Sequence, residues 1–140
     1  MKHKAQGGAA AVEFALVFPI FLLLVFAIIE FGFVLYDKAV ITNASREMAR
    51  KGVILQKSAH TSDELKSILT KYQGSLVSFK TLPNNPSMGD GDPPGLNGGS
   101  GTPLSVTVTY NYYGLGLGPF LSPFTGGALA LSATTVMNNE

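Results

Sequence analysis

The sequence predicts an α+β protein, in which a long N-terminal transmembrane helix is followed by a short helix and a small antiparallel three-stranded sheet. Three observations predict this class. Residues 14–29 form an uncharged, apolar run, residues 61–74 carry helix start and stop signals, and residues 105–112 alternate between polar and apolar side chains. A chain of 140 residues therefore divides into one anchoring helix and one small mixed domain.

The apolar run can anchor the chain in a membrane if the helix extends to residue 36. Residues 14–29 alone fall short of the ~20 residues that a hydrocarbon core needs. Extension through residue 36 gives about 35 Å of helix, provided that Glu30 lies near an interface or has a partner. We assign residues 9–36 to a transmembrane and assembly helix. Pro19 removes one helix hydrogen bond, so it is either a functional kink or a proline tolerated in lipid.

The flanking residues predict the orientation and the processing of this helix. Lys2 and Lys4 precede it, which places the N-terminus in the cytoplasm and residues 37–140 outside. Small residues at 7–11 also come before the apolar run, whereas a secretory signal peptide has them after it. A cut at the small residues would therefore leave the apolar segment on the mature chain.

The residues around this point resemble the processing site of type IV pilin-like proteins. In that family a prepilin peptidase cuts after a glycine, and a glutamate is the fifth residue of the mature chain. Gly8 fits because it is followed by Ala-Ala-Ala-Val-Glu-Phe, which makes Glu13 the fifth residue. A cut after Gly7 would make it the sixth. The resemblance thus implies cleavage between Gly8 and Ala9, with residues 1–8 removed as a basic leader.

More narrowly, residues 7–53 resemble the TadE-like pseudopilins of the tight-adherence (Tad/Flp) pilus system. The Glu-Phe pair ending in Phe14, the early proline, the stretch Asn-Ala-Ser-Arg-Glu-Met-Ala-Arg at 43–50 and the ending at 131–140 all match that pattern. The chain departs from it at residues 137–139, which are Met-Asn-Asn where the family usually has arginines. The motif leaves the TadE and TadF types both open, and the TadE type fits better.

This resemblance implies a minor pseudopilin needed for assembly of a type IVb pilus in adherence or secretion. Its partners would be a prepilin peptidase, other pseudopilins, the major pilin and the bacterial inner (cytoplasmic) membrane. Glu13 and Phe14 would serve processing and assembly. Glu13 either pairs with the new amine of Ala9, one helical turn away, or lies among lipid headgroups. The alternative function is an uncleaved, membrane-tethered periplasmic binding module.

Beyond the membrane, the first helix is expected to continue as an amphipathic helix. Ile41, Ala44, Met48 and Leu55 fall on roughly one face. Arg46 and Arg50 fall largely elsewhere, either as contacts to other subunits or as a solvated face. Residues 61–64, Thr-Ser-Asp-Glu, form a capping box that predicts a second helix, with a stop at Gly74.

The sheet is expected from three segments, 75–82, 105–112 and 128–137. Residues 83–103 are rich in Gly and Pro and predict an exposed loop. Asp90 in this loop is only a weak indication of a calcium-binding loop, because the twelfth position, which needs a bidentate acid, is Gly101. Apolar residues within 114–127 predict a loop that packs on the sheet or meets a partner.

Composition excludes several functional classes. The chain has no cysteine, so disulfides, Cys-ligated zinc and thiol catalysis are excluded. A net charge of +1 gives no reason to expect a nucleic-acid partner. His3 and His60 lie on opposite predicted sides of the membrane and cannot share a site. We expect no enzymatic activity, no cofactor and no metal.

Overall fold

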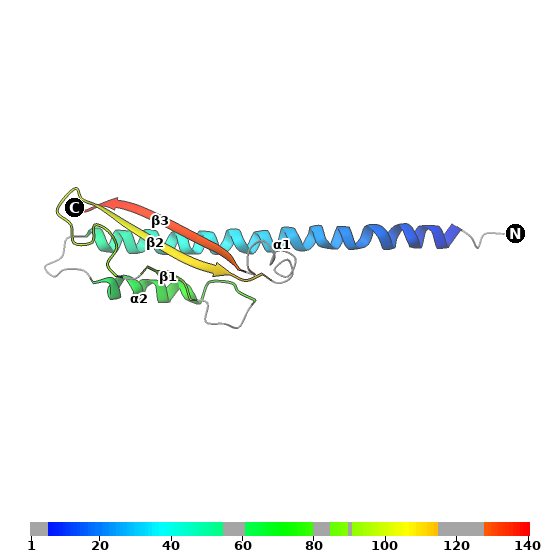
Figure 1. The fold of residues 1–140 in the computed structure, drawn as a ribbon, viewed down its shortest axis with the longest axis horizontal. Helices are drawn as coiled ribbons and strands as arrows, with labels where there is room; N and C mark the ends of the chain where they lie inside the picture. The colour runs from blue at the N-terminus through cyan, green and yellow to red at the C-terminus, as the bar shows by residue number, and fades with distance from the viewer. Residues whose placement is uncertain (1–5, 55–60, 80–84, 90, 115–127) are drawn as a thin grey trace.

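The computed structural model describes residues 6–54, 61–79, 85–89, 91–114 and 128–140. One helix, α1 (Gln6–Val53), runs almost the whole length of the molecule (Figure 1). The other elements cover its C-terminal half, and its N-terminal half extends away from them. We call residues 8–29 of α1 the stalk. The head is α1 from Glu30 onward together with α2 and the sheet.

Helix α1 has two different surfaces along its length because only its second half has a partner. In the head, Ile41, Ala44 and Met48 are at most 1% exposed, which confirms the predicted amphipathic face. The remaining member of that face, Leu55, lies outside the described residues. In the stalk, residues 8–21 are all exposed.

Close packing at the end of α1 depends on Gly52. A Cβ atom at this position would lie 2.5 Å from Cδ2 of Leu104, which is itself fully buried. The missing side chain therefore lets the sheet approach the helix backbone, and this contact offsets the low helix propensity of glycine.

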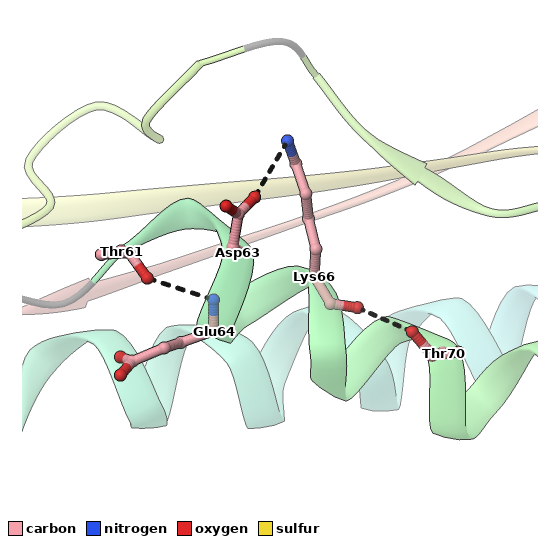
Figure 2. A network of polar contacts seen from close by, with 5 residues as sticks. All are labelled: Thr61, Asp63, Glu64, Lys66 and Thr70. Carbon is pink, nitrogen blue, oxygen red and sulfur yellow. Dashed lines mark hydrogen bonds and ion pairs between the residues drawn. The ribbon is translucent and has the colours of Figure 1, made fainter.

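Helix α2 (Ser62–Gln73) begins where the sequence predicts. The Oγ1 atom of Thr61 accepts a hydrogen bond from the backbone N–H of Glu64 at 3.3 Å, so Thr61 is the N-cap (Figure 2). Asp63 in the first turn lies 4.0 Å from Lys66, as Figure 2 also shows. An N-cap bond and acids in the first turn both favour helix initiation at this point.

The far end and the inner face of α2 also agree with the sequence. Gly74 is the C-cap, and its N–H donates to the carbonyl of Tyr72. Leu65, Ile68 and Leu69 are buried against α1 and the sheet. These three residues recur at helical spacing, so the apolar face of this helix is part of the core.

Three antiparallel strands form one sheet in the order β1-β2-β3. β2 (Pro103–Tyr112) pairs with β3 (Leu129–Asn138) along its full length, whereas β1 (Ser87–Met88) adds two residue pairs to the other edge of β2. The α+β class with a long helix, a short helix and a three-stranded sheet is confirmed.

One face of the sheet packs on the helices. The alternation predicted for β2 is confirmed, because every second residue is at most 3% exposed: Leu104, Val106, Val108, Tyr110 and Tyr112. From β3, Leu131 and Ala133 join the same core. The opposite face is rich in threonine, and Thr107 and Thr134 form a hydroxyl pair across it at 2.9 Å.

The predicted strand at 75–82 is wrong over residues 75–79, and residues 80–82 lie outside the described part. The segment leaves α2 and lies between α1 and the end of β2, where the hydroxyl of Tyr110 donates to the carbonyl of Val77 at 3.1 Å, but it forms no strand. The N–H of Val77 donates to Oδ1 of Asp37 at 2.9 Å, and Phe79 packs edge-on against Phe33, with ring centroids 5.4 Å apart. Its weak alternation reflects packing on a helix.

Strand β1 instead lies within the segment predicted as an exposed loop. Met88 and Pro93 in this segment are buried, and Gly91, Gly95 and Gly101 adopt positive φ. Asp90 and the apolar loop at 115–127 lie outside the described residues.

Candidate functional site

The stalk is the most exposed apolar surface of the described chain. Among the described residues, one helix is long and apolar enough to cross a membrane, judged by length and composition, and its most apolar 18-residue window has no buried residue. The 22 stalk residues extend for about 33 Å. Because a hydrocarbon core is about 30 Å thick, the stalk alone can span it. Glu30, the first buried residue, then lies at its end.

The predicted processing residues lie together in the first turns of α1. Gly8, Ala9 and Glu13 are all exposed, and no atom lies within 4 Å of the place where a Gly8 Cβ would be. Ala9 and Glu13 are four residues apart and therefore share one helix face. An amine at Ala9 and the carboxylate of Glu13 would be neighbours on this surface.

The other two predicted stalk residues lie further along. Phe14 is 63% exposed and stacks on Phe18, with ring centroids 5.0 Å apart. Pro19 lies inside α1, which continues through it as a helix. Both residues thus belong to the exposed apolar surface and make no described contact with the head.

An acidic cluster, formed by Glu30, Asp37 and Tyr112, lies where the head meets the stalk. Glu30 is 9% exposed and Asp37 is fully buried, and the two are two helical turns apart on one face of α1. Glu30 packs against Gly114, where a Cβ would lie only 1.5 Å from its Oε1. Gly114 is therefore required for this close approach.

The polar atoms of this cluster are incompletely satisfied within the described structure. Oδ1 of Asp37 accepts the bond from Val77, but Oδ2 has no hydrogen-bond partner, and neither has the buried hydroxyl of Tyr112. Burial raises the pKa of Asp37, and the bond from Val77 opposes this shift only in part. Burial, with the charges of Glu30 and Asp37, raises the pKa of Tyr112 to about 12. The head therefore favours the protonated form of both groups.

A second polar surface contains the two predicted arginines. Arg46 and Arg50 lie one turn apart and line an open groove of about 870 Å³ between α1 and α2. We call it the cationic groove. Its basic residues are Arg46, Arg50, Lys51 and Lys71, its acidic residues are Glu47 and Glu64, and Ile54, Ser67, Ile68 and Met137 complete it.

The charges of the cationic groove are unevenly paired. Glu47 accepts a hydrogen bond from the hydroxyl of Tyr72 at 2.6 Å and lies 4.0 Å from Nζ of Lys71. Arg46, Arg50 and Lys51 form no ion pair with any residue that the structure describes. Arg46 and Arg50 are exposed and Lys51 is half-buried, and within the described residues none of the three is in an ion pair.

Comparison with known proteins identifies a related family for the stalk and the first part of the head. Residues 8–50 match the family model of TadE-like proteins. This region of the chain is TadE-like. The TadE-like region begins at Gly8 and ends at Arg50, and the resemblance is confirmed there. It contains all the candidate site residues predicted from the sequence: Gly8, Ala9, Glu13, Phe14, Pro19, Arg46 and Arg50. The resemblance associates the chain with the Tad pilus system. No curated protein and no solved structure matches the chain.

Sequence reasoning missed the acidic cluster. The sequence indicates for Glu30 only that it needs an interface or a partner, and it suggests no role for Asp37. Their seven-residue spacing, in register with Ile41, Ala44 and Met48, was the available signal, because it places both acids on the buried face. The proximity of Tyr112 to these two acids cannot be predicted from the sequence, because it depends on where β2 packs on α1. In the part of the chain that the structure describes, no three His, Cys, Asp or Glu residues are grouped to hold a metal.

Proposed function

We propose that the protein is a minor pseudopilin of a type IVb (Tad/Flp) pilus, cut after Gly8 by a prepilin peptidase and assembled through its stalk. One observation carries the proposal. The TadE-like region starts at Gly8, the residue that the count back from Glu13 selects, and it leads directly into an exposed apolar helix.

The physics of the stalk supports a role in assembly. A helix that is apolar all round is stable only where lipid or other helices surround it. Since lipid tails are as apolar as leucine, moving the stalk from the bilayer into a helical bundle preserves the burial of its side chains. The exposed residues of the stalk, including Phe14, Leu16, Phe21 and Ile28, would then be packing contacts between subunits.

Among the stalk residues, Glu13 is the one whose burial in a helical bundle depends most on a charged partner. A carboxylate inside an apolar environment is costly unless it is paired. After cleavage, the amine of Ala9 would supply a positive charge one turn away on the same face, in the same chain or in a neighbouring one. We propose that this pairing lets Glu13 enter the bundle.

The rest of the proposal concerns location and partners. The chain would be a single-pass protein of the bacterial inner membrane, with its N-terminus in the cytoplasm and its head outside. It would contact a prepilin peptidase, other pseudopilins and the major pilin. It would act as a structural component and not as an enzyme, with no cofactor.

N-terminal sequencing and intact mass of the membrane-fraction protein test the proposal. In cells with active prepilin peptidase the chain should begin at Ala9, and without the peptidase at Met1. A Met1 start in cells with active peptidase would contradict the proposal and favour an uncleaved, membrane-tethered periplasmic binding module.

Three variants refine the test. Gly8→Ala should block cleavage, whereas the matched control Gly7→Ala should not, because the count from Glu13 selects Gly8. Glu13→Ala should be cut and yet fail to assemble. Normal pili from the Glu13→Ala variant would remove the charge-pairing argument while leaving the cleavage site intact.

A further inference from the structure

We infer that the cationic groove binds an acidic, amphipathic segment of another subunit of the pilus assembly. The inference rests on the proposed function for the identity of the assembly. The groove has its own structural basis in the head, remote from the cleavage site.

The composition of the groove defines the chemistry of its occupant. Four basic and two acidic side chains line it, so its charge exceeds the +1 of the whole chain. Three of the basic groups, Arg46, Arg50 and Lys51, have no described acidic partner. Ile54, which is 40% exposed, adds an apolar surface beside them. Carboxylates over the basic groups and an apolar side chain over Ile54 would complement both features.

Contacts between α1 and α2 form the walls of the groove. Lys71 and Tyr72 of α2 both hold Glu47 of α1, through the contacts of 4.0 Å and 2.6 Å. Beneath them, Ile68 is 7% exposed within the core. Glu47 thus faces α2 and forms no ion pair with Arg46 or Arg50. With four basic and two acidic side chains, the groove carries an excess of positive charge.

The membrane surface is too far away to be the occupant. Arg46 lies 16 residues beyond Glu30, which places it about 24 Å further along the helix axis. Electrostatic attraction to anionic headgroups falls off over a screening length of about 8 Å at physiological salt. Headgroups at the end of the stalk would thus contribute little binding to the groove.

A second copy of this chain is also a poor fit. Of the described acids outside the groove, Glu13 is on the stalk, Glu30 and Asp37 are buried, and Asp63 lies beside Lys66. Asp92 and Glu140 remain, which are fewer than the three unpaired basic groups. A different subunit with clustered acids is therefore the occupant that the charges favour.

Site-specific photocrosslinking in cells that make the pilus system tests this inference on the full chain. A photoreactive residue replaces Ser67, an exposed residue of the groove, and a matched control replaces Thr107 on the exposed face of the sheet. The Ser67 position should form a specific adduct, and mass spectrometry should place the crosslink in a segment of another protein that is rich in Asp and Glu. Absence of an adduct, or crosslinks to lipid, to a second copy or to an uncharged segment, would overturn the inference.

Charge reversal provides the decisive control. Arg50→Glu should lower the adduct yield by about tenfold, since one attractive contact becomes repulsive. Lys66→Glu changes the net charge equally but lies outside the groove, so it should leave the yield unchanged. Replacing the crosslinked acids of the partner with lysine should restore the adduct with Arg50→Glu. Equal losses in Arg50→Glu and Lys66→Glu, or no restoration, would show that the groove is not a specific site.

The same cells separate the inference from the proposed function. N-terminal sequencing of the Arg50→Glu variant should still find a chain that begins at Ala9. If every form begins at Met1, the proposed function fails, while the crosslinks still report on the groove. If cleavage is normal and the charge variants have no effect, the groove inference alone fails.

Discussion

Replacement of Gly95 by alanine should destabilise the head strongly, because two separate costs arise at this position. Gly95 has a φ of +85°. A left-handed backbone costs a residue with a side chain about 1–2 kcal/mol. In addition, the new Cβ would lie 2.0 Å from the carbonyl oxygen of Pro103 and 2.8 Å from its carbonyl carbon. Backbone atoms at the start of β2 would have to move, since no side-chain rotation relieves this overlap.

The movement should break the hydrogen bonds that hold the turn to the sheet. The N–H of Ser105 donates to the carbonyl of Pro94 at 2.9 Å, and Nδ2 of Asn139 donates to the carbonyl of Gly95 at 2.8 Å. Each bond contributes about 1 kcal/mol, and Asn139 is buried, so its amide would lose a partner without gaining water. Together with the backbone strain, we expect a loss of about 3–4 kcal/mol in the free energy of unfolding.

Two neighbouring glycines serve as matched controls. Gly101 has a φ of +83° but no atom within 4 Å of its Cβ position, so Gly101→Ala isolates the backbone strain and should cost about 1–2 kcal/mol. Gly99 has neither feature, so Gly99→Ala should be close to neutral. Urea unfolding of the full chain in nonionic detergent, followed by near-UV circular dichroism of the buried tyrosines, gives the three values. If Gly95→Ala is no less stable than Gly101→Ala, the argument from the clash is wrong.

Three further predictions concern the acidic cluster and the capping of α2. Because folding raises the pKa of Asp37 above its ordinary value of 3.8, stability should rise as the pH falls from neutral towards that value. Asp37→Asn should remove most of this rise in urea titrations. Tyr112→Phe should keep or slightly increase the melting temperature, since its buried hydroxyl has no described partner to lose, and a clear decrease would contradict this. Thr61→Ala should cost about 1 kcal/mol in urea unfolding, whereas Thr70→Ala, on the exposed side of α2, should cost much less.

Most of the regular structure could be predicted because its signals are local. The capping residue Thr61 and the stop at Gly74 define α2 from within one short stretch of sequence. The alternation at 105–112 defines β2, and β3 begins and ends within one residue of its predicted bounds. Each of these patterns follows from the period of its own element and needs no distant partner.

The failed strand at 75–82 shows where local signals are insufficient. Val77 and Phe79 alternate as strand residues would, but the N–H of Val77 donates to Asp37 and the ring of Phe79 packs on Phe33, both on α1. The backbone of Phe79 donates to Tyr113, just beyond the end of β2, without forming a ladder. The same side-chain spacing can pack on a helix or enter a ladder. Only the position of α1 decides between the two outcomes.

The sequence by itself indicated a long apolar helix at the N-terminus, and its order of small, acidic and apolar residues selects Gly8 as the predicted cleavage site, because these features depend only on neighbours along the chain. The tertiary structure alone decided where the head begins and which charges meet. It buried Glu30 against Gly114 and Asp37 against Val77, and it brought Lys71 of α2 and Arg50 of α1 into one groove. Such contacts depend on how the elements pack, and side-chain periodicity carries no information about the partner that a face will meet.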